Sequence, residues 1–355
     1  MLRTGEPLYD YAAETAAQSS LVSPTPFTLP FMSPPYTALL FVPFSWFDYK
    51  TAFFLFLAFN LACLGLALFL LRPFTVTLDT KWRLTVAFIA LSFLPLGIAL
   101  IFGQLSVLLL LLYCACFVAL QSGRPTLAGV FLALALIKFQ IALPVALLFL
   151  LWRQWRFFAG FLTGAFALTL LSLRVTGAAA TQAYLYSLLA MSQASSTGAG
   201  QTKYAIYSAE MPNLYGLLNT VFSGAPSSLY LTVLLSLLVL LWAALQRPSL
   251  PLALLAGILV SYHLYLYDFT LLLLPMLLIL NTGIDLPLKG RLKAAFITCG
   301  LLAPAAFFLT DFNHDYLFAL PLTALFLLSP GVLPETPANA QTQPAEPTPH
   351  TTTPA

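Results

Sequence analysis

Long apolar stretches of the chain alternate with short polar loops, and these loops carry most of the lysine and arginine residues. An apolar run of about 20 residues is long enough to cross the hydrocarbon core of a bilayer as a helix. The pattern predicts membrane helices at 50–71, 84–102, 105–120, 157–173, 229–245, 294–310 and 317–328. The apolar segment 36–47 is too short to cross, so we expect it to be re-entrant or to lie at the membrane interface.

A lysine interrupts the apolar sequence between Leu127 and Trp155. A cation at this depth costs a few kcal/mol, so Lys138 needs a partner or a wet cavity. As one straight helix, this block of about 26 residues would rise about 39 Å and separate Arg124 from Arg153. Two short helices that meet at Lys138 would return the chain to its starting side. We favour this hairpin; the alternative is one kinked span whose lysine extends to the interface or pairs structurally.

Residues 251–279 repeat the pattern, with two short apolar halves on either side of the polar tip His263–Asp268. With both hairpins, the basic residues follow the positive-inside rule. The chain then has about 11 membrane helices and an external amino terminus. The ten basic residues expected inside are Arg72, Lys81, Arg83, Arg124, Arg153, Arg156, Arg247, Lys289, Arg291 and Lys293, and the four expected outside or at the interface are Arg3, Lys50, Arg174 and Lys203.

The same pattern predicts three regions. Residues 1–35 form an external loop with a short helix near 11–18, because this stretch is rich in proline and hydroxyl residues. Residues 36–329 form the transmembrane domain, and its longest polar connection, 174–228, is external and contains an amphipathic helix near 181–191. Residues 330–355, rich in Pro, Thr, Ala and Gln, form a disordered cytoplasmic tail.

Composition supports an all-α polytopic membrane protein over a soluble domain. Of the 355 residues, 60% are hydrophobic and 8% are charged, and the mean hydropathy is +0.91. The net charge of +3 gives no indication of nucleic-acid binding. All four cysteines lie in apolar segments without metal-ligand spacing, which argues against disulfides and a zinc site. No signal peptide opens the chain, so an external amino terminus leads us to expect a further helix upstream of Met1.

Polar residues at the two hairpin tips are the candidates for function. A lysine at membrane depth suits the phosphate of a lipid-linked ligand, and His263 and Asp268 could orient that phosphate or a sugar hydroxyl. The alternative for His263 is an interior histidine bound to backbone carbonyls. Asp268 is costly in the membrane without a cation such as Lys138. Gln104 and Asn213 are substrate-binding candidates for which a role in a turn is equally consistent with the sequence.

Four short motifs together resemble glycosyltransferase family 87. They are Gly5-Glu-Pro-Leu-Tyr-Asp10, Pro34-Pro-Tyr36 before an apolar segment, Gly103-Gln104 before a leucine-rich span, and Arg124-Pro-Thr-Leu-Ala-Gly129 leading to Lys138. The resemblance extends over about residues 5–316 and adds Tyr36 to the substrate-binding candidates. This family includes the mycobacterial mannosyltransferases that depend on polyprenol-phosphate mannose.

The resemblance implies a GT-C-type membrane transferase that takes a hexose from a polyprenyl-phosphate sugar at the external face of the cell membrane, without a nucleotide sugar. Its partners would be membrane lipids, the lipid-linked donor, and a lipid or glycan acceptor. It implies no cofactor; a divalent metal is compatible with it but not indicated. The family's general base is an aspartate that would fall upstream of Met1, so Asp10 and Glu14 are the substitutes to consider. The family's Lys-Pro pair is Lys138-Phe139 here.

The expected mechanism is direct displacement at the anomeric carbon. A carboxylate would take the acceptor proton, and Lys138, with His263, would stabilise the leaving polyprenyl phosphate. Two other classes remain open. A transporter or flippase of lipid-linked saccharides would also place polar residues in a cavity at mid-membrane depth. A noncatalytic homologue is expected if the chain has no base upstream of Met1.

Overall fold

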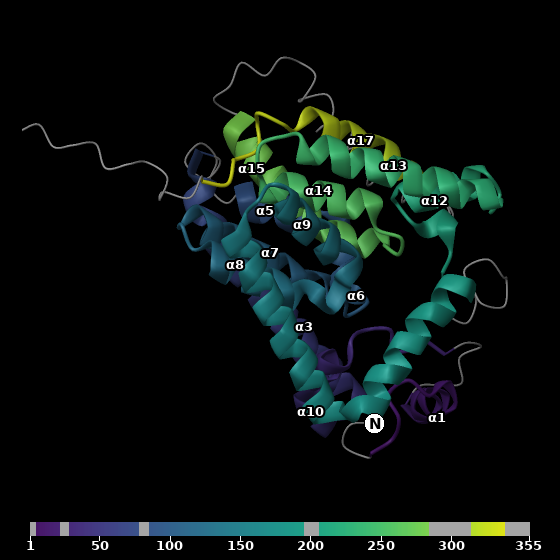
Figure 1. Cartoon of the computed structure of the whole chain (residues 1–355). Helices are drawn as coiled ribbons and strands as arrows, with labels where there is room; N and C mark the ends of the chain where they lie inside the picture. Colours follow the sequence, from purple (N-terminus) through teal and green to yellow (C-terminus); the bar gives the residue numbers. More distant parts are fainter. Residues whose placement is uncertain (1–4, 22–27, 78–84, 195–205, 284–313, 338–355) are drawn as a thin grey trace, which may run out of the picture.

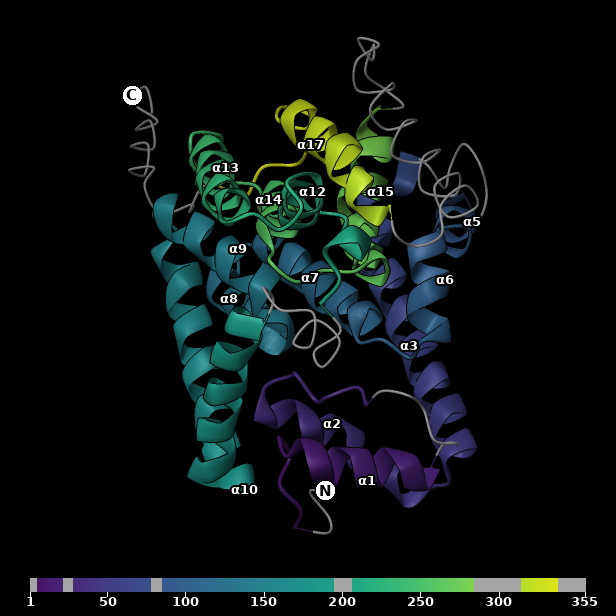
Figure 2. The same cartoon turned by 90° about the vertical axis from the view of Figure 1, so that its right-hand side faces the viewer.

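The computed structural model describes residues 5–21, 28–77, 85–194, 206–283 and 314–337, and every regular element in these ranges is helical. Most helices form one bundle, and the amino-terminal helices α1 (Tyr11–Leu21) and α2 (Ala38–Phe41) form a separate layer at one end (Figure 2). Within these ranges, four helical stretches are long and apolar enough to cross a membrane, and four shorter apolar helices accompany them. The chain is therefore an all-α polytopic membrane protein, as predicted.

Helix α3 (Tyr49–Leu71) is the first full crossing, close to the predicted 50–71. It begins where the Asp48 side chain accepts the backbone N–H groups of Lys50 and Thr51, which satisfies two of the unpaired donors at a helix start. The preceding elements are short: η1 (Pro35–Thr37), α2 and η2 (Pro43–Trp46). As expected, none of them is long enough to cross the membrane.

The predicted single helix at 84–102 is wrong. The chain forms α5 (Thr85–Leu91) and α6 (Leu94–Ile101), separated by two non-helical residues. Pro95 occupies one of the first two positions of α6. A proline has no N–H to donate to the preceding turn but is accepted at a helix start, so the helix breaks and restarts there. Helix α7 (Ser106–Gln121) follows as predicted.

Helix α10 (Trp155–Ala194) joins two segments that the sequence pattern keeps apart, the span at 157–173 and the amphipathic helix near 181–191. Gly177 has φ of 80° and ψ of 169°, so the chain turns sharply inside this element. Such a positive φ is accessible to glycine without steric cost. Figure 1 shows the two halves of α10 diverging from this kink. The amphipathic half is thus continuous with a membrane-crossing helix.

The remaining helices complete the bundle. Their bounds are α8 (Pro125–Leu134), η4 (Ala135–Lys138), α9 (Phe139–Leu151), η5 (Ser208–Glu210), α12 (Leu214–Val221), α13 (Pro226–Ala244), α14 (Leu250–Val260), η6 (Leu266–Leu272), α15 (Leu273–Gly283), η7 (Asp315–Phe318) and α17 (Ala319–Leu328). Helix α14 lies at the centre, because every residue from its start to Leu259 is buried. The predicted helix at 294–310 falls outside the described residues.

Helices α8 and α9 form the predicted hairpin, although 125–151 is also long and apolar enough for one crossing. A Cβ on Gly160 would overlap the backbone carbonyl of Thr126, and one on Gly129 would overlap that of Phe157. The start of α10 therefore lies against the start of α8. The Phe149 and Phe157 rings stack 3.9 Å apart, which brings the end of α9 to the same place. A single crossing would separate these positions by the whole length of the stretch.

Several basic residues share one end of the bundle, which we call the arginine end. The hairpin brings Arg124 and Arg153 together, and the Phe74–Phe117 ring contact at 5.0 Å places the end of α3 beside the last turns of α7. Glu335 then links two further elements, since its backbone carbonyl accepts from Gln121 and its carboxylate pairs with Arg247. Residues 330–337, which the sequence assigned to the tail, thus pack on the arginine end. The rest of the predicted tail lies outside the described residues.

Candidate functional site

Four of the predicted site residues, Gln104, Lys138, His263 and Asp268, lie together near the middle of the bundle's depth. Asn60 lies close to the midpoint of the 23-residue helix α3 and donates from Nδ2 to the carbonyl of Gln104 at 3.4 Å. Gly103, at φ of 59°, makes the turn that ends α6 before α7 begins. Since α7 starts beside the middle of a full crossing, Gln104 and Ser106 lie about half-way between the two ends of α3.

Lys138 and Asp268 form an ion pair at the meeting point of the two hairpin tips. The Asp268 side chain is fully buried, and that of Lys138 is 15% exposed. Asp268 Oδ1 accepts a hydrogen bond from Ser106 Oγ at 2.8 Å, and Oδ2 accepts the Tyr265 backbone N–H at 3.0 Å. The sequence argument that Asp268 requires a cation such as Lys138 therefore gave the correct contact.

Local backbone geometry produces this contact. Lys138 ends η4 with φ of −121° and ψ of 71°, so the helix stops at the lysine and restarts at Phe139. Asp268 lies in the first turn of η6, where a carboxylate can accept backbone N–H groups. The Lys138 ammonium also lies 5.1 Å from the centroid of the Tyr267 ring, within the range of a cation–π contact. Both partners are thus fixed by breaks between short helices.

A cavity of about 330 Å³, which we call the Lys138 cavity, opens beside the ion pair. On the bundle side it is lined by both hairpin tips and the start of α7. On the other side it is covered by the extended segment 29–33 and by Phe41 of α2. Its polar lining residues are Ser33, Gln104, Ser106, Lys138, Gln140, His263, Tyr265, Tyr267 and Asp268. This volume lies at the small end of the range for ligand-binding pockets.

Two lining side chains have buried polar atoms without a hydrogen-bond partner among the described residues. They are Nδ1 of His263 and Oε1 of Gln140. His263 is 6% exposed, and its ring packs edge-on against Tyr265 at 5.2 Å. The alternative that backbone carbonyls bind Nδ1 of this histidine is not what the structure has. Unpaired buried polar atoms are costly, so a ligand or water that paired them would be stabilised.

Of the other predicted substrate-binding residues, one lines the cavity and two do not. Gln104 lines the cavity. Asn213 does not, because its side chain is used locally: Nδ2 donates to the Ser261 carbonyl at 2.5 Å and Oδ1 accepts the Gly216 N–H at 2.9 Å, which caps α12. Tyr36 lies in η1 outside the cavity lining, with its hydroxyl buried. Asn213 therefore fits its alternative role in a turn.

Neither carboxylate proposed as a substitute base lies in the Lys138 cavity. Asp10 caps α1, accepting the N–H groups of Ala12 and Ala13 on Oδ1 at 2.8 and 3.2 Å. Glu14 is 4% exposed and accepts the N–H of Phe31 at 3.0 Å. Burial raises the pKa of the Glu14 carboxyl above its usual value. Of the described lining residues, Asp268 is the one that carries a carboxylate.

Sequence reasoning missed Ser106, Gln140 and Tyr267, which also line the cavity. A serine in the first turn of a helix is an ordinary feature and gave no signal, whereas Tyr267 lay within the predicted tip His263–Asp268 and could have been included. Gln140, two residues after Lys138, belonged to the predicted tip and could have been included. Segment 29–33 had no signal at all, because its place over the cavity depends on contacts with α1.

The assembled site can bind an anionic group next to neutral polar ones. An ammonium has three N–H donors, and the contact with Asp268 uses one of them. The others can reach a phosphate placed in the cavity, while the amide, imidazole and hydroxyl groups can bind sugar hydroxyls. The described residues contain no group of three or more His, Cys, Asp or Glu side chains placed to hold a metal ion.

Comparisons with known proteins gave one match. The sequence model of glycosyltransferase family 87 matches residues 31–275, well over half of the chain. This range contains the first hairpin, the tip of the second and every bundle-side residue of the Lys138 cavity. No curated protein and no solved structure matches the chain.

Proposed function

Because the chain belongs to glycosyltransferase family 87, we propose that it transfers a hexose, such as mannose, from a polyprenyl-phosphate donor to a lipid or glycan acceptor. The reaction would take place at the external face of the cell membrane. Membership of the family gives the reaction class, and the apolar helices give the membrane setting. The donor, the acceptor and the side of the membrane are the parts that we add.

The observation that supports a lipid-linked donor is the depth of the Lys138 cavity. A soluble nucleotide sugar needs a site open to water, whereas the phosphate of a polyprenyl lipid lies next to the hydrocarbon core. The cavity lies near the middle of the bundle and contains a cation. Placing a cation at this depth costs free energy, so its presence indicates that the charge has a function.

In the proposed reaction the acceptor hydroxyl attacks the anomeric carbon, and the bond from that carbon to the phosphate oxygen breaks. The hydroxyl proton passes to a base, and the polyprenyl phosphate leaves with an additional negative charge. Lys138 would stabilise this charge as it develops, and His263 would hold the phosphate or the sugar beside it. We assign Asp268 a positioning role, because its oxygens already bind Ser106, Tyr265 and Lys138.

The test is transfer by the purified full chain in liposomes, with radiolabelled polyprenyl-phosphate mannose or nucleotide sugar as donor. We expect product from the lipid-linked donor alone. Replacing Lys138 by methionine would leave Asp268 unpaired, so the informative variant is the double substitution Lys138→Met with Asp268→Asn, which removes both charges. This variant should insert and remain monodisperse but lose transfer by at least about 100-fold, the scale of one lost transition-state contact.

The matched control breaks an ion pair away from the cavity. Glu335→Gln removes the partner of Arg247 at the arginine end and should leave transfer unchanged. Full activity in the double variant would contradict the role of Lys138. A transporter or flippase would instead move the labelled lipid across the bilayer without forming a new glycosidic bond, and the same liposomes distinguish these outcomes.

A further inference from the structure

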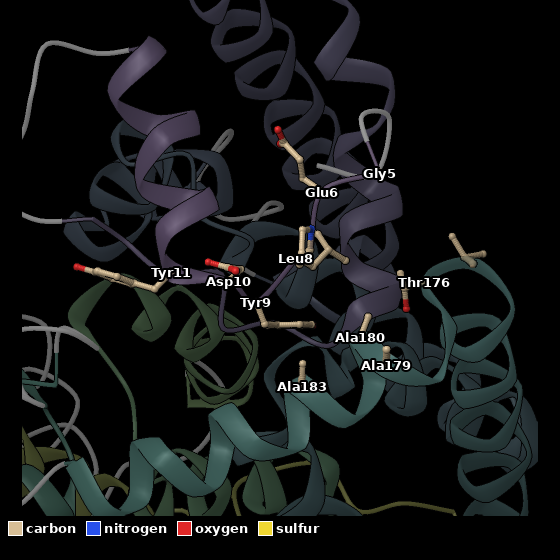
Figure 3. A pocket seen from close by; sticks show the side chains of 12 residues that line it. Gly5, Glu6, Leu8, Tyr9, Asp10, Tyr11, Thr176, Ala179, Ala180 and Ala183 are labelled. Atoms are coloured by element: carbon tan, nitrogen blue, oxygen red, sulfur yellow. The ribbon is translucent and has the colours of Figure 1, made fainter.

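A second cavity lies between the amino-terminal segment and α10. It has a volume of about 770 Å³ and is lined by residues 5–11 and by five residues of α10. Val175 and Thr176 lie just before the Gly177 kink, and Ala179, Ala180 and Ala183, spaced three to four residues apart, share one face of the helix beyond it. We call this the amino-terminal cavity; it is shown in Figure 3.

The lining is polar on one side and small and apolar on the other. Figure 3 shows the Tyr9 side chain directed toward the α10 face that carries Ala180 and Ala183, whereas the carboxylates of Glu6 and Asp10 extend away from that face. None of the described lining residues is Lys, Arg or His. Carboxylates accept hydrogen bonds from hydroxyl groups and repel anions. The lining therefore favours a neutral, hydroxyl-rich ligand over a phosphate.

The position of this cavity connects it to the Lys138 cavity. The first part of α10, residues 155–176, is about 33 Å long at 1.5 Å per residue, so the Gly177 kink lies a full membrane crossing away from the arginine end. The Tyr9 hydroxyl donates to the carbonyl of Ser33 at 2.7 Å. Tyr9 lines the amino-terminal cavity and Ser33 lines the Lys138 cavity. One hydrogen bond thus joins the walls of the two cavities.

We propose that the amino-terminal cavity binds the neutral saccharide head group of the acceptor, next to a donor whose phosphate is held at Lys138. The identification of this ligand as the acceptor rests on the proposed function. The binding of a neutral saccharide in the cavity does not depend on it. A ligand at the membrane surface reaches the amino-terminal cavity first, and the charged phosphate is assigned to the cavity that has the cation. The two cavities divide the substrates by charge.

The experiment measures binding separately from transfer. On the full chain in lipid nanodiscs, saturation-transfer NMR would report binding of methyl α-mannoside as the neutral probe, and broadening of the ³¹P line would report binding of inorganic phosphate as the anionic one. Ala183→Trp fills the α10 face of the cavity, and Ala178→Trp adds the same ring to the same helix outside the lining. We expect the mannoside signal to fall at least fivefold in Ala183→Trp and to persist in Ala178→Trp, with phosphate binding unchanged in both.

Three other outcomes would overturn this inference. A mannoside signal that survives Ala183→Trp but disappears in the uncharged Lys138→Met, Asp268→Asn variant would place the saccharide in the Lys138 cavity and overturn the inference. The absence of a mannoside signal in the unmodified chain would overturn it as well. In the transfer assay, Ala183→Trp should raise the KM for the acceptor and leave that for the donor. If both KM values were unchanged while Lys138 remained essential, this inference would fail and the proposed function would stand.

Discussion

At the residue scale, the buried ion pair is the feature with the largest energetic consequence. Removing one partner of such a pair leaves an uncompensated charge and costs about 3–5 kcal/mol. Asp268→Asn should therefore lower the stability of the folded protein by roughly this amount, since the Asp268 side chain is fully buried. The measurement is the midpoint of thermal unfolding in detergent, followed by monodispersity on a sizing column.

Two comparisons make that result specific. The uncharged double variant Lys138→Met, Asp268→Asn should recover much of the lost stability, because no unpaired charge then remains buried at this site. Glu335→Gln breaks a pair whose side chains are 81% and 49% exposed, so it should cost less than about 1 kcal/mol. Equal losses for Asp268→Asn and Glu335→Gln would mean that burial does not govern the contribution of the Lys138 pair.

Ser106 offers a finer test of the same site. Its hydroxyl donates to Asp268 Oδ1 from the start of α7, and a hydrogen bond to a charged group contributes about 1.5–3 kcal/mol. Ser106→Ala should keep the ion pair but loosen the carboxylate that positions Lys138. We expect transfer to fall by about tenfold with little change in the KM for the acceptor. A loss as complete as that of the Lys138 double variant would instead assign Ser106 to direct substrate contact.

The sequence predicted individual site residues correctly where burying a charged side chain in an apolar segment would cost free energy. A lysine and an aspartate in apolar segments each require a partner, and Lys138 and Asp268, 130 residues apart in the sequence, pair with one another. Ser106 carries no such cost. Its contribution exists only after α7 meets the two hairpin tips, so no local pattern could have indicated it. For Asn213 the sequence was equally consistent with a ligand and with a turn residue, and only the hydrogen bond that its side chain accepts from the Gly216 N–H assigned it to a helix cap.

At the scale of elements, close contact between α8 and α10 holds the hairpin in place. Gly160 faces the Thr126 carbonyl so closely that any Cβ would overlap it, and small residues allow such an approach between membrane helices. Gly160→Ala should force the helices apart and cost about 1–3 kcal/mol. The matched control is Gly65→Ala on α3, where nothing lies within 4 Å of the added Cβ, and where the greater helix propensity of alanine adds up to about 1 kcal/mol of stability. Thermal unfolding compares the two variants.

A pH dependence is expected where η7 meets η5. Asp315 is 4% exposed and lies before the apolar helix α17. Burial, with the negative charge of Glu210, raises the pKa of the Asp315 carboxyl to about 7. Because the folded state holds this proton more tightly than the unfolded chain, whose aspartate pKa is about 3.9, the folded state is favoured at low pH. That contribution decreases as the pH rises from about 4 to 7.

Asp315→Asn removes the titrating group and should flatten the change of unfolding temperature between pH 5 and pH 8. Glu6→Gln, a change in the amino-terminal segment away from η7, should leave the slope as it is. A slope that persisted in Asp315→Asn would assign the pH dependence to another group, and Glu210, whose carboxyl pKa is also raised by burial, would be the next to replace.

The predicted elements failed where a backbone break interrupted apolar sequence. The helices at 50–71 and 229–245 were correct because length and hydropathy alone determine a crossing. The helix at 105–120 is present, but it begins beside the middle of α3 and is shorter than a full crossing. Residues 84–102 have the same hydropathy, but Pro95 divides them into α5 and α6. At Gly177 the chain bends, but the amphipathic helix remains continuous with the membrane-crossing part of α10. Hydropathy alone predicts neither the break before Pro95 nor this continuity.

At the scale of the whole molecule, the distribution of basic residues and the packing of glycines give the same topology by independent routes. Charge placed Arg124 and Arg153 on one side. The contacts of Gly129 and Gly160 bring the same two positions together with no reference to charge. This agreement means that the Lys138 tip, about half a crossing from the arginine end, faces the amino-terminal layer. The layer and the tip then enclose the cavity between them.

This topology predicts which positions label from each side of the membrane. In a chain with Cys299 replaced by serine, the other three cysteines are buried and free. New cysteines at Ser122 and at Arg153, both exposed at the arginine end, should react with a membrane-impermeant maleimide from the same side. A cysteine at Ser45, before the start of α3, should react from the opposite side.

The labelling distinguishes the two arrangements of 125–151 directly. If this stretch crossed once, Ser122 and Arg153 would label from opposite sides, and Lys138 would face lipid or a neighbouring helix instead of a cavity beneath the amino-terminal layer. With the hairpin, labelling of Ser45 from outside intact cells would also place the Lys138 cavity on the external half of the membrane. Labelling of Ser45 only after the cells are opened would reverse the proposed orientation and leave the hairpin itself intact.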